Sequence, residues 1–231
     1  MKAVDTRNKK AFFNQIKSAV NDQFEKAEVD EVNKFIDQLF VSVFINEFEG
    51  RRVSDLLGLI ISAWKFFNIH QSEHAKVEVF NPSLEEHAWQ SSHTVVMVLQ
   101  KNTPFIVDSV RMVLAANHIK THSLQYSSVQ CQRNENGSID KIIKSKQTQV
   151  FTGEAVIFIE VDKHSDEAAR QNLRLSIESA LQDVSAAVND YSVMNDLVTN
   201  ISNGLSNKNA GSTDEKEINE AKKFICWLSN N

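Results

Sequence analysis

Two pairs of histidines have a spacing that could hold a metal ion. His70 and His74 are four residues apart, as are His118 and His122. A zinc-protease helix carries such a pair as H-E-x-x-H, with the glutamate acting as general base. In this chain the residues between the histidines misplace that glutamate or lack it, and both pairs fall where we expect a helix to end. We therefore predict surface or boundary histidines and no metal site.

A second candidate for chemistry is the run Glu85-Glu86-His87. Adjacent carboxylates beside an imidazole could carry out acid–base catalysis. The run lies in a polar, irregular stretch, residues 81–93, where neighbours in sequence rarely converge on one point. We favour a solvated loop, and the alternative is a free-standing enzyme with its site at these residues.

The glycines argue against a nucleotide site. The chain has six of them, at Gly50, Gly58, Gly137, Gly153, Gly204 and Gly211. A phosphate-binding turn clusters glycines, because its backbone must reach positive φ and bring bare N–H groups to the phosphate oxygens. No two of these glycines have the G-x-G spacing, so neither the dinucleotide fingerprint nor the P-loop can be written. We predict no catalytic or cofactor-binding residues in this chain.

The composition is that of an ordinary globular protein, with 42% hydrophobic and 24% charged residues. The net charge of −5 and the lack of a long basic cluster disfavour nucleic acid or an anionic membrane as partner. No apolar run reaches the ~18 residues that a membrane helix needs. The two cysteines, Cys131 and Cys226, lie far apart in unlike contexts, which favours a reducing cytoplasm over a disulfide.

Residues 1–74 are predicted to form a helical segment. Apolar residues recur at helical spacing within residues 8–24, 28–48 and 54–68. The third helix is apolar around more than half of its circumference, so it is buried on several sides or meets a partner. We favour a phenylalanine-rich helical core, and the alternative is docking on another domain or subunit. The residues expected at such an interface are Leu57, Ile60, Trp64 and Phe67.

Residues 75–199 alternate between strand and helix patterns. Strands are predicted at 76–80, 94–99, 119–133, 139–144 and 154–161, with helices at 104–117 and from Ser165 or Asp166 onward. The strand–helix–strand unit from Thr94 to Leu124 must cross over right-handed, which gives parallel or split pairing. The predicted fold class is α+β, a ferredoxin-like sheet with helices on one face, preceded by the helical segment.

The corner between residues 94–99 and the following helix is a candidate ligand site. Thr103 is the predicted N-cap and Pro104 the first helical residue. The N–H groups at that helix end would point outward, so an anion or an amino-acid carboxylate could bind near Asn102 and Thr103.

The composition changes near residue 200. Residues 202–217 are rich in glycine, serine, asparagine and charge, and we predict a flexible linker over 200–217. A helical pattern resumes from Ile218 to Leu228. We interpret 218–231 as the first helix of a following, truncated domain.

Several motifs in combination resemble the N-terminal region of the large bacterial NAD-dependent glutamate dehydrogenases. They are Asn81-Pro82, Glu85-Glu86-His87, Trp89-Gln90-Ser91 and the run from Pro104 to Val110. The resemblance spans roughly residues 50–200 and 217–231, and it is looser over the first 48 residues.

The resemblance implies an ACT-like domain at 75–199 with a regulatory or assembly role. It also implies that oxidative deamination of L-glutamate with NAD occurs in a C-terminal domain absent from this sequence. The expected partners are then other domains and subunits of the same enzyme, a cytoplasmic homo-oligomer; the alternative is a module that binds an amino-acid effector. Ligand-sensing ACT domains usually carry glycine directly after the corner proline, whereas this chain has Phe105. We expect its ring to fill the space that a ligand needs, which favours assembly over sensing.

Overall fold

The computed structural model describes residues 9–40, 51–71, 74–143, 153–207 and 215–229. The chain divides into two compact units, residues 1–184 and 185–231. The long helix α6 (Glu167–Asn207) contributes its first part to one unit and its remainder to the other.

The first unit combines helices with a four-stranded antiparallel sheet. Its helices are α1 (Lys9–Asn21), α2 (Lys26–Leu39), α3 (Val53–Asn68), α4 (Leu84–His87), α5 (Ile106–Ala116) and the first part of α6. Its strands are β1 (Lys76–Phe80), β2 (Thr94–Lys101), β3 (Thr121–Val129), β4 (Cys131–Arg133), β5 (Ile139–Ile142) and β6 (Glu154–Val161). The predicted α+β class is confirmed.

The main sheet has the strand order β1-β2-β6-β3, and β4 and β5 form a separate hairpin. Since both β2 and β3 pair antiparallel with β6, they run parallel to each other with β6 between them. The unit β2-α5-β3 is therefore the split crossover that the sequence predicted. The hairpin turns at Gly137, whose φ of +75° suits glycine.

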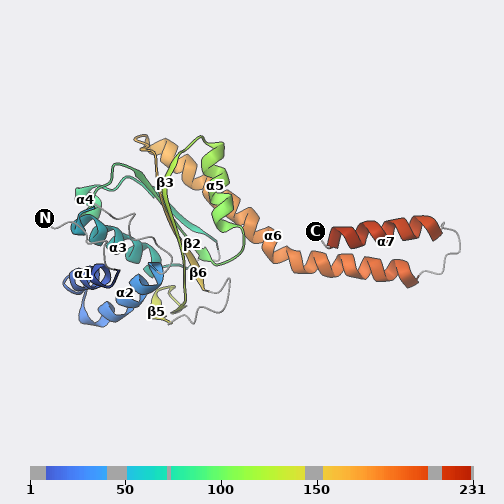
Figure 1. Cartoon of the computed structure of the whole chain (residues 1–231), viewed down its shortest axis with the longest axis horizontal. Coiled ribbons are helices and arrows are strands. Elements are labelled where there is room, and N and C mark those ends of the chain that lie inside the picture. The colour runs from blue at the N-terminus through green and yellow to red at the C-terminus, as the bar shows by residue number, and fades with distance from the viewer. Residues whose placement is uncertain (1–8, 41–50, 72–73, 144–152, 208–214, 230–231) are drawn as a thin grey trace. The chain divides into compact units, whose positions relative to one another are not determined.

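Both faces of the sheet are covered, which explains the continuous apolar runs of its central strands. On one face, Val95, Met97 and Leu99 of β2 belong to one core with α1, α2 and α3. On the other face, Val96 and Val98 pack with residues of α5 and the first part of α6. Figure 1 shows this layering, with the sheet between the two groups of helices. Helices α5 and the first part of α6 lie on one face, as predicted, whereas the N-terminal helices and the short α4 lie on the opposite face.

Several predicted boundaries need correction. Helix α5 begins at Ile106, not Pro104, and β2 continues through Gln100 and Lys101, beyond the predicted strand end at residue 99. The predicted strand at 119–133 is two strands, β3 and β4. The helix α6 runs to Asn207, so the predicted linker over 200–217 is wrong in its first part. The middle of that linker, 208–214, lies outside the described residues, as does the predicted helix end at Gly50.

The second unit contains the C-terminal part of α6 and α7 (Glu215–Ser229). Helix α7 begins three residues before the predicted Ile218. None of the described helices combines the length and hydrophobicity that crossing a membrane requires.

Candidate ligand corner and buried polar network

The corner between β2 and α5 has an unusual backbone. Phe105 is the N-cap of α5, with φ +69° and ψ 0° in the left-handed region. A bulky residue rarely adopts this conformation, which glycine adopts readily. Phe105 is 67% exposed, so its side chain is not packed into the core. The expectation that its ring fills the space that a ligand needs stays a prediction.

The helix end at this corner carries no side-chain cap. Thr103, predicted as the N-cap, lies two residues before the observed N-cap, Phe105. The phenyl side chain of Phe105 cannot accept a hydrogen bond from the N–H groups of the first turn. The first N–H groups of α5 thus lack the oxygen that serine, threonine or aspartate would supply. A negatively charged group could take that place.

Asn102 is held in position by strand β3 and is only 4% exposed. Its Nδ2 donates to Ser128 Oγ at 3.2 Å, and Tyr126 Oη donates to its Oδ1 at 2.8 Å. Burial raises the pKa of the Tyr126 hydroxyl, so this group stays a donor at neutral pH. The backbone N–H of Asn102 donates to the Gly153 carbonyl at 3.0 Å. Asn102 is therefore a fixed part of the corner.

Unpartnered polar atoms gather beside this corner. Five buried side-chain nitrogen or oxygen atoms of the described residues lack a hydrogen-bond partner, and three of the five belong to Gln100 and Thr103. Gln100 is 3% exposed, and neither its Oε1 nor its Nε2 is bonded. Strand alternation puts its side chain on the α5 side, with Val96 and Val98. Each unmade bond of this kind costs about 1–3 kcal/mol, so these atoms are suited to receive a ligand or water.

The sequence analysis missed Gln100. The available signal was an amide side chain ending an otherwise apolar run, TVVMVLQ. The predicted strand ends at residue 99, which places Gln100 in the connection to the helix, where an amide needs no explanation.

The four predicted interface residues lie in the core instead. Ile60, Trp64 and Phe67 are at most 2% exposed, and Leu57 is partly buried against the same cluster. Trp64 Nε1 donates to Glu28 Oε1 of α2 at 2.8 Å. This face is covered by the chain's own helices and sheet, which agrees with the phenylalanine-rich core that we favoured, and the alternative of an interface at these four residues is corrected accordingly.

The run Glu85-Glu86-His87 forms most of α4, and of its side chains only Glu86 and His87 are paired, with Oε2 and Nδ1 3.9 Å apart. Glu85 and Glu86 are exposed. The imidazole of His87 stacks on Phe80 with ring centroids 4.7 Å apart. The hydroxyl of Ser83 accepts a hydrogen bond from the Glu86 backbone N–H, which starts the short helix. This arrangement is a capped turn on the surface.

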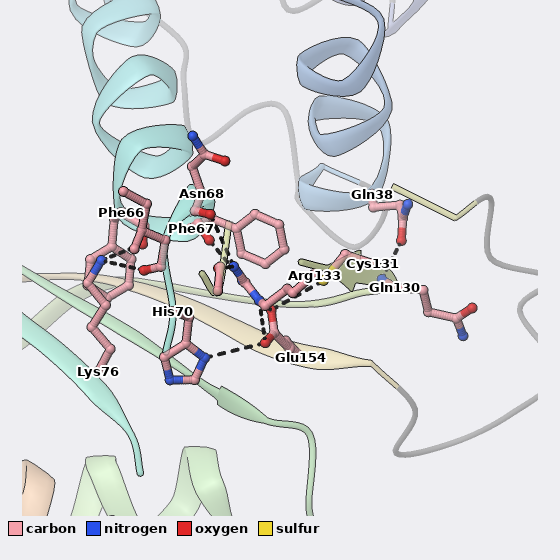
Figure 2. A network of polar contacts seen from close by, with 12 residues as sticks. Gln38, Phe66, Phe67, Asn68, His70, Lys76, Gln130, Cys131, Arg133 and Glu154 are labelled. Atoms are coloured by element: carbon pink, nitrogen blue, oxygen red, sulfur yellow. Dashed lines mark hydrogen bonds and ion pairs between the residues drawn. The ribbon is translucent and has the colours of Figure 1, made fainter. Parts of the chain in front are cut away.

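A partly buried ion pair joins the hairpin to β6 (Figure 2). Arg133 of β4 donates to Glu154 of β6 through Nε at 2.9 Å and Nη2 at 2.6 Å. His70 Nδ1 and Cys131 Sγ also contact this carboxylate, at 3.3 and 3.4 Å. Burial alone would raise the pKa of Glu154, but hydrogen bonds from His70 and Arg133 outweigh it and lower the pKa to about 2.

The same network satisfies the C-terminal end of α3. Arg133 donates to the carbonyls of Phe67 and Asn68 at 2.8 and 3.1 Å. Lys76 Nζ donates to the carbonyls of Phe66 and Ile69 at 2.7 and 3.0 Å. A helix leaves its last carbonyls without partners and its C-terminal end partly negative, so two cations are well placed there.

The network is structural because it leaves no group open for a ligand. All five N–H donors of Arg133 have acceptors, the fifth being the Gly137 carbonyl at 2.7 Å. Burial and the nearby charge of Glu154 raise the pKa of the Cys131 thiol to about 12, so it is not a nucleophile at neutral pH.

The predicted histidine pairs do not form joint sites. His70 Nε2 contacts the backbone oxygen of His74, and His122 Nε2 lies 2.6 Å from Asp162 Oδ1. Among the residues that the structure describes, no group of three potential ligands could hold a metal ion.

Comparison with known proteins places the chain in a family. Residues 35–177 match the model of the glutamate dehydrogenase ACT1 domain. The chain belongs to this family. The matched ACT1 region begins within α2, includes every strand, and ends in the first part of α6. It therefore contains the corner and the Arg133–Glu154 network.

Two curated relatives align with nearly the whole chain. The NAD-specific glutamate dehydrogenase of Halomonas elongata is 30% identical over 93% of this chain, and that of Pseudomonas aeruginosa is 29% identical over 97%. The chain spans only 13% and 14% of the length of these two proteins.

Proposed function

We propose that this chain is the non-catalytic N-terminal regulatory and assembly segment of a large NAD-dependent glutamate dehydrogenase. The parent reaction converts L-glutamate, NAD and water to 2-oxoglutarate, ammonia and NADH. In this proposal, NAD and the substrate bind in another part of the parent enzyme. The partners of the segment are other domains and subunits of a cytoplasmic homo-oligomer.

The observation that carries the proposal is the family match, which includes all the strands of the first unit. The glycines that the structure describes in this unit support it as well. Gly137 and Gly153 have positive φ next to hairpin and strand ends, and Gly58 packs against Trp89. None of these three stands beside a helix N-terminus, where a phosphate would bind.

A chimaera tests the proposal. The region of the Pseudomonas aeruginosa enzyme that aligns with this chain is replaced by this chain in one version and deleted in another. We expect the chimaera to keep the number of subunits per oligomer and the rate of NADH formation from L-glutamate. We expect the deletion variant to form oligomers with fewer subunits. Sedimentation velocity and absorbance at the NADH band give the two readouts. A deletion variant with an unchanged number of subunits, kcat and KM would refute the assembly role.

An amino-acid-binding module is the second candidate function. The unbonded amide of Gln100, the unbonded hydroxyl of Thr103 and the uncapped end of α5 favour it. An amino acid carries a carboxylate for the helix end and an ammonium group for an amide oxygen.

Calorimetry of the chain against the common amino acids tests this second candidate. If one binds, Gln100→Leu should weaken it at least tenfold, because that change removes two of the three unbonded atoms. The exposed Gln90 provides the matched control, Gln90→Leu, which should leave binding unchanged. Flat titrations with every amino acid would eliminate the candidate.

A further inference from the structure

A groove of about 540 Å³ lies in the first unit where α3, α4 and β1 meet. Its apolar lining includes Phe66, Phe80 and Met97. Phe66 and Met97 are each only 3% exposed, so the groove reaches down to the core. Its volume is in the range of pockets that hold ligands or partner side chains.

The rim of this groove is acidic. Glu78 of β1 and Glu85 and Glu86 of α4 line it, and all three are exposed. Among the described residues, the ion pairs give none of these carboxylates a lysine or arginine partner. One cation, Lys65 of α3, also lines the groove, together with the imidazole of His87. Glu86 lies 3.9 Å from His87, and Lys76, which lies over the Phe66 ring, interacts with Glu78. Three carboxylates against these two lysines leave the rim with net negative charge.

The groove lies along an open strand edge. Within the described part of the chain, β1 pairs with β2 alone and is the outer strand of the sheet. Val77 and Val79 pack with the core under α5 and α6, so alternation places Glu78 and Phe80 on the groove side. An extended segment that adds to this edge would direct every second side chain over the groove.

We propose that the groove binds an extended basic segment from another part of the enzyme, paired along β1. Its lysine or arginine side chains alternate with apolar ones. The charged heads meet Glu78, Glu85 and Glu86, and their aliphatic stems cover Phe66, Phe80 and Met97. The alternate apolar residues lie on the opposite face, beside Val77 and Val79. The inference rests on the proposed assembly function and names the chemistry of one partner surface. It also gives the exposed Glu85-Glu86-His87 run a binding role instead of an acid–base one.

Methionine methyl NMR gives a direct readout. Met97 lines the groove, whereas Met112 and Met194 are 70% and 52% exposed on α5 and α6 and serve as internal controls. The probe is the acetylated, amidated peptide Lys-Phe-Lys-Leu-Lys, added to the full 231-residue chain labelled at its methionine methyls. We expect the chemical shift of the Met97 methyl to change as peptide is added, until binding is saturated. The chemical shifts of the Met112 and Met194 methyls should not change.

Two sets of variants test the parts of the proposal separately. The double variant Glu85→Lys, Glu86→Lys should bind the peptide at least tenfold more weakly. The control Glu135→Lys, in the exposed hairpin turn, should bind it with unchanged affinity. The Met97 signal of the double variant without peptide shows that it is folded, because this methyl is buried in the core of the first unit. A peptide methylated at alternate backbone amides cannot pair with a strand and should bind at least tenfold more weakly.

Four outcomes would overturn the proposal. They are an unmoved Met97 signal, equal binding by a peptide with glutamate in place of lysine, equal binding by the methylated peptide, and full binding by the double variant. If spermidine or L-arginine bound with the same affinity as the peptide, the groove would be assigned to a small cation instead. Because the chimaera reports assembly without using this peptide, a chimaera that assembles while the groove stays empty would overturn only this inference.

Discussion

At the scale of single residues, the close packing of Trp89 explains why a glycine stands at position 58 inside helix α3. A Cβ at this position would lie 2.5 Å from Cβ of Trp89, although glycine inside a helix costs about 1 kcal/mol relative to alanine. We predict that Gly58→Ala lowers the free energy of unfolding by about 1–3 kcal/mol, because the tight contact must open. Gly204→Ala is the matched control, since nothing lies within 4 Å of Gly204 in α6. Urea unfolding measures both, and a stabilised Gly58→Ala variant would contradict the packing argument.

Glu154 gives a residue-scale prediction for pH. Its pKa is about 2 in the folded chain, below its ordinary value of 4.5. A carboxylate with a depressed folded pKa stabilises the fold above the unfolded pKa, and this contribution disappears as the pH falls toward the folded one. We predict that Glu154→Gln flattens the fall in unfolding free energy between pH 4.5 and 2. Urea midpoints across this range test it, with Glu135→Gln in the exposed turn as control; parallel curves for wild type and Glu154→Gln would contradict it.

At the scale of elements, the β2–α5 corner carries the clearest local strain. A left-handed conformation costs an L-residue about 1–2 kcal/mol, whereas glycine's extra freedom in the unfolded chain costs about 0.5–1 kcal/mol. Since the ring of Phe105 is exposed, we predict that Phe105→Gly stabilises the chain by up to about 1 kcal/mol. Thermal unfolding measures the change. Gly137→Ala is the mirror control and should destabilise, because Gly137 has φ +75° and a Cβ there would meet the His70 carbonyl at 2.6 Å.

The elements also show how far the sequence could predict this structure. Periodicity identified the strands around Val96 and Ile157 and the split crossover, because these patterns depend on local burial. It could not predict what covers α3, since an apolar surface specifies burial and not the covering element. The composition also led us to predict a linker where α6 continues. The helix continues because serine and asparagine lower helix propensity only slightly and Gly204 alone does not end a helix. Gln100 went unnoticed because an unbonded amide is visible only once its neighbours are placed.

At the scale of the whole molecule, the N-terminal helices are part of the sheet domain's core. Six buried side chains of the main sheet pack in the core that these helices share: Val95, Met97, Leu99, Val129, Val156 and Phe158. Burying each is worth about 1.5–3 kcal/mol, so together they match the whole stability of a typical domain, about 5–15 kcal/mol. The residues 1–74 therefore cannot be a separable segment in energetic terms, although they precede the sheet in sequence.

This reasoning predicts opposite results for two truncations. A chain of residues 1–184 keeps the complete first unit and should unfold cooperatively at a urea midpoint close to that of the full chain. A chain of residues 75–231 exposes one whole face of the sheet and should associate or lose its cooperative transition, because an uncovered apolar face of this size is rare on a monomer. Circular dichroism in urea and light scattering distinguish the two results. A monomeric, cooperatively folded 75–231 chain would show that the sheet is stable without the N-terminal helices, and the first unit would then divide at residue 75.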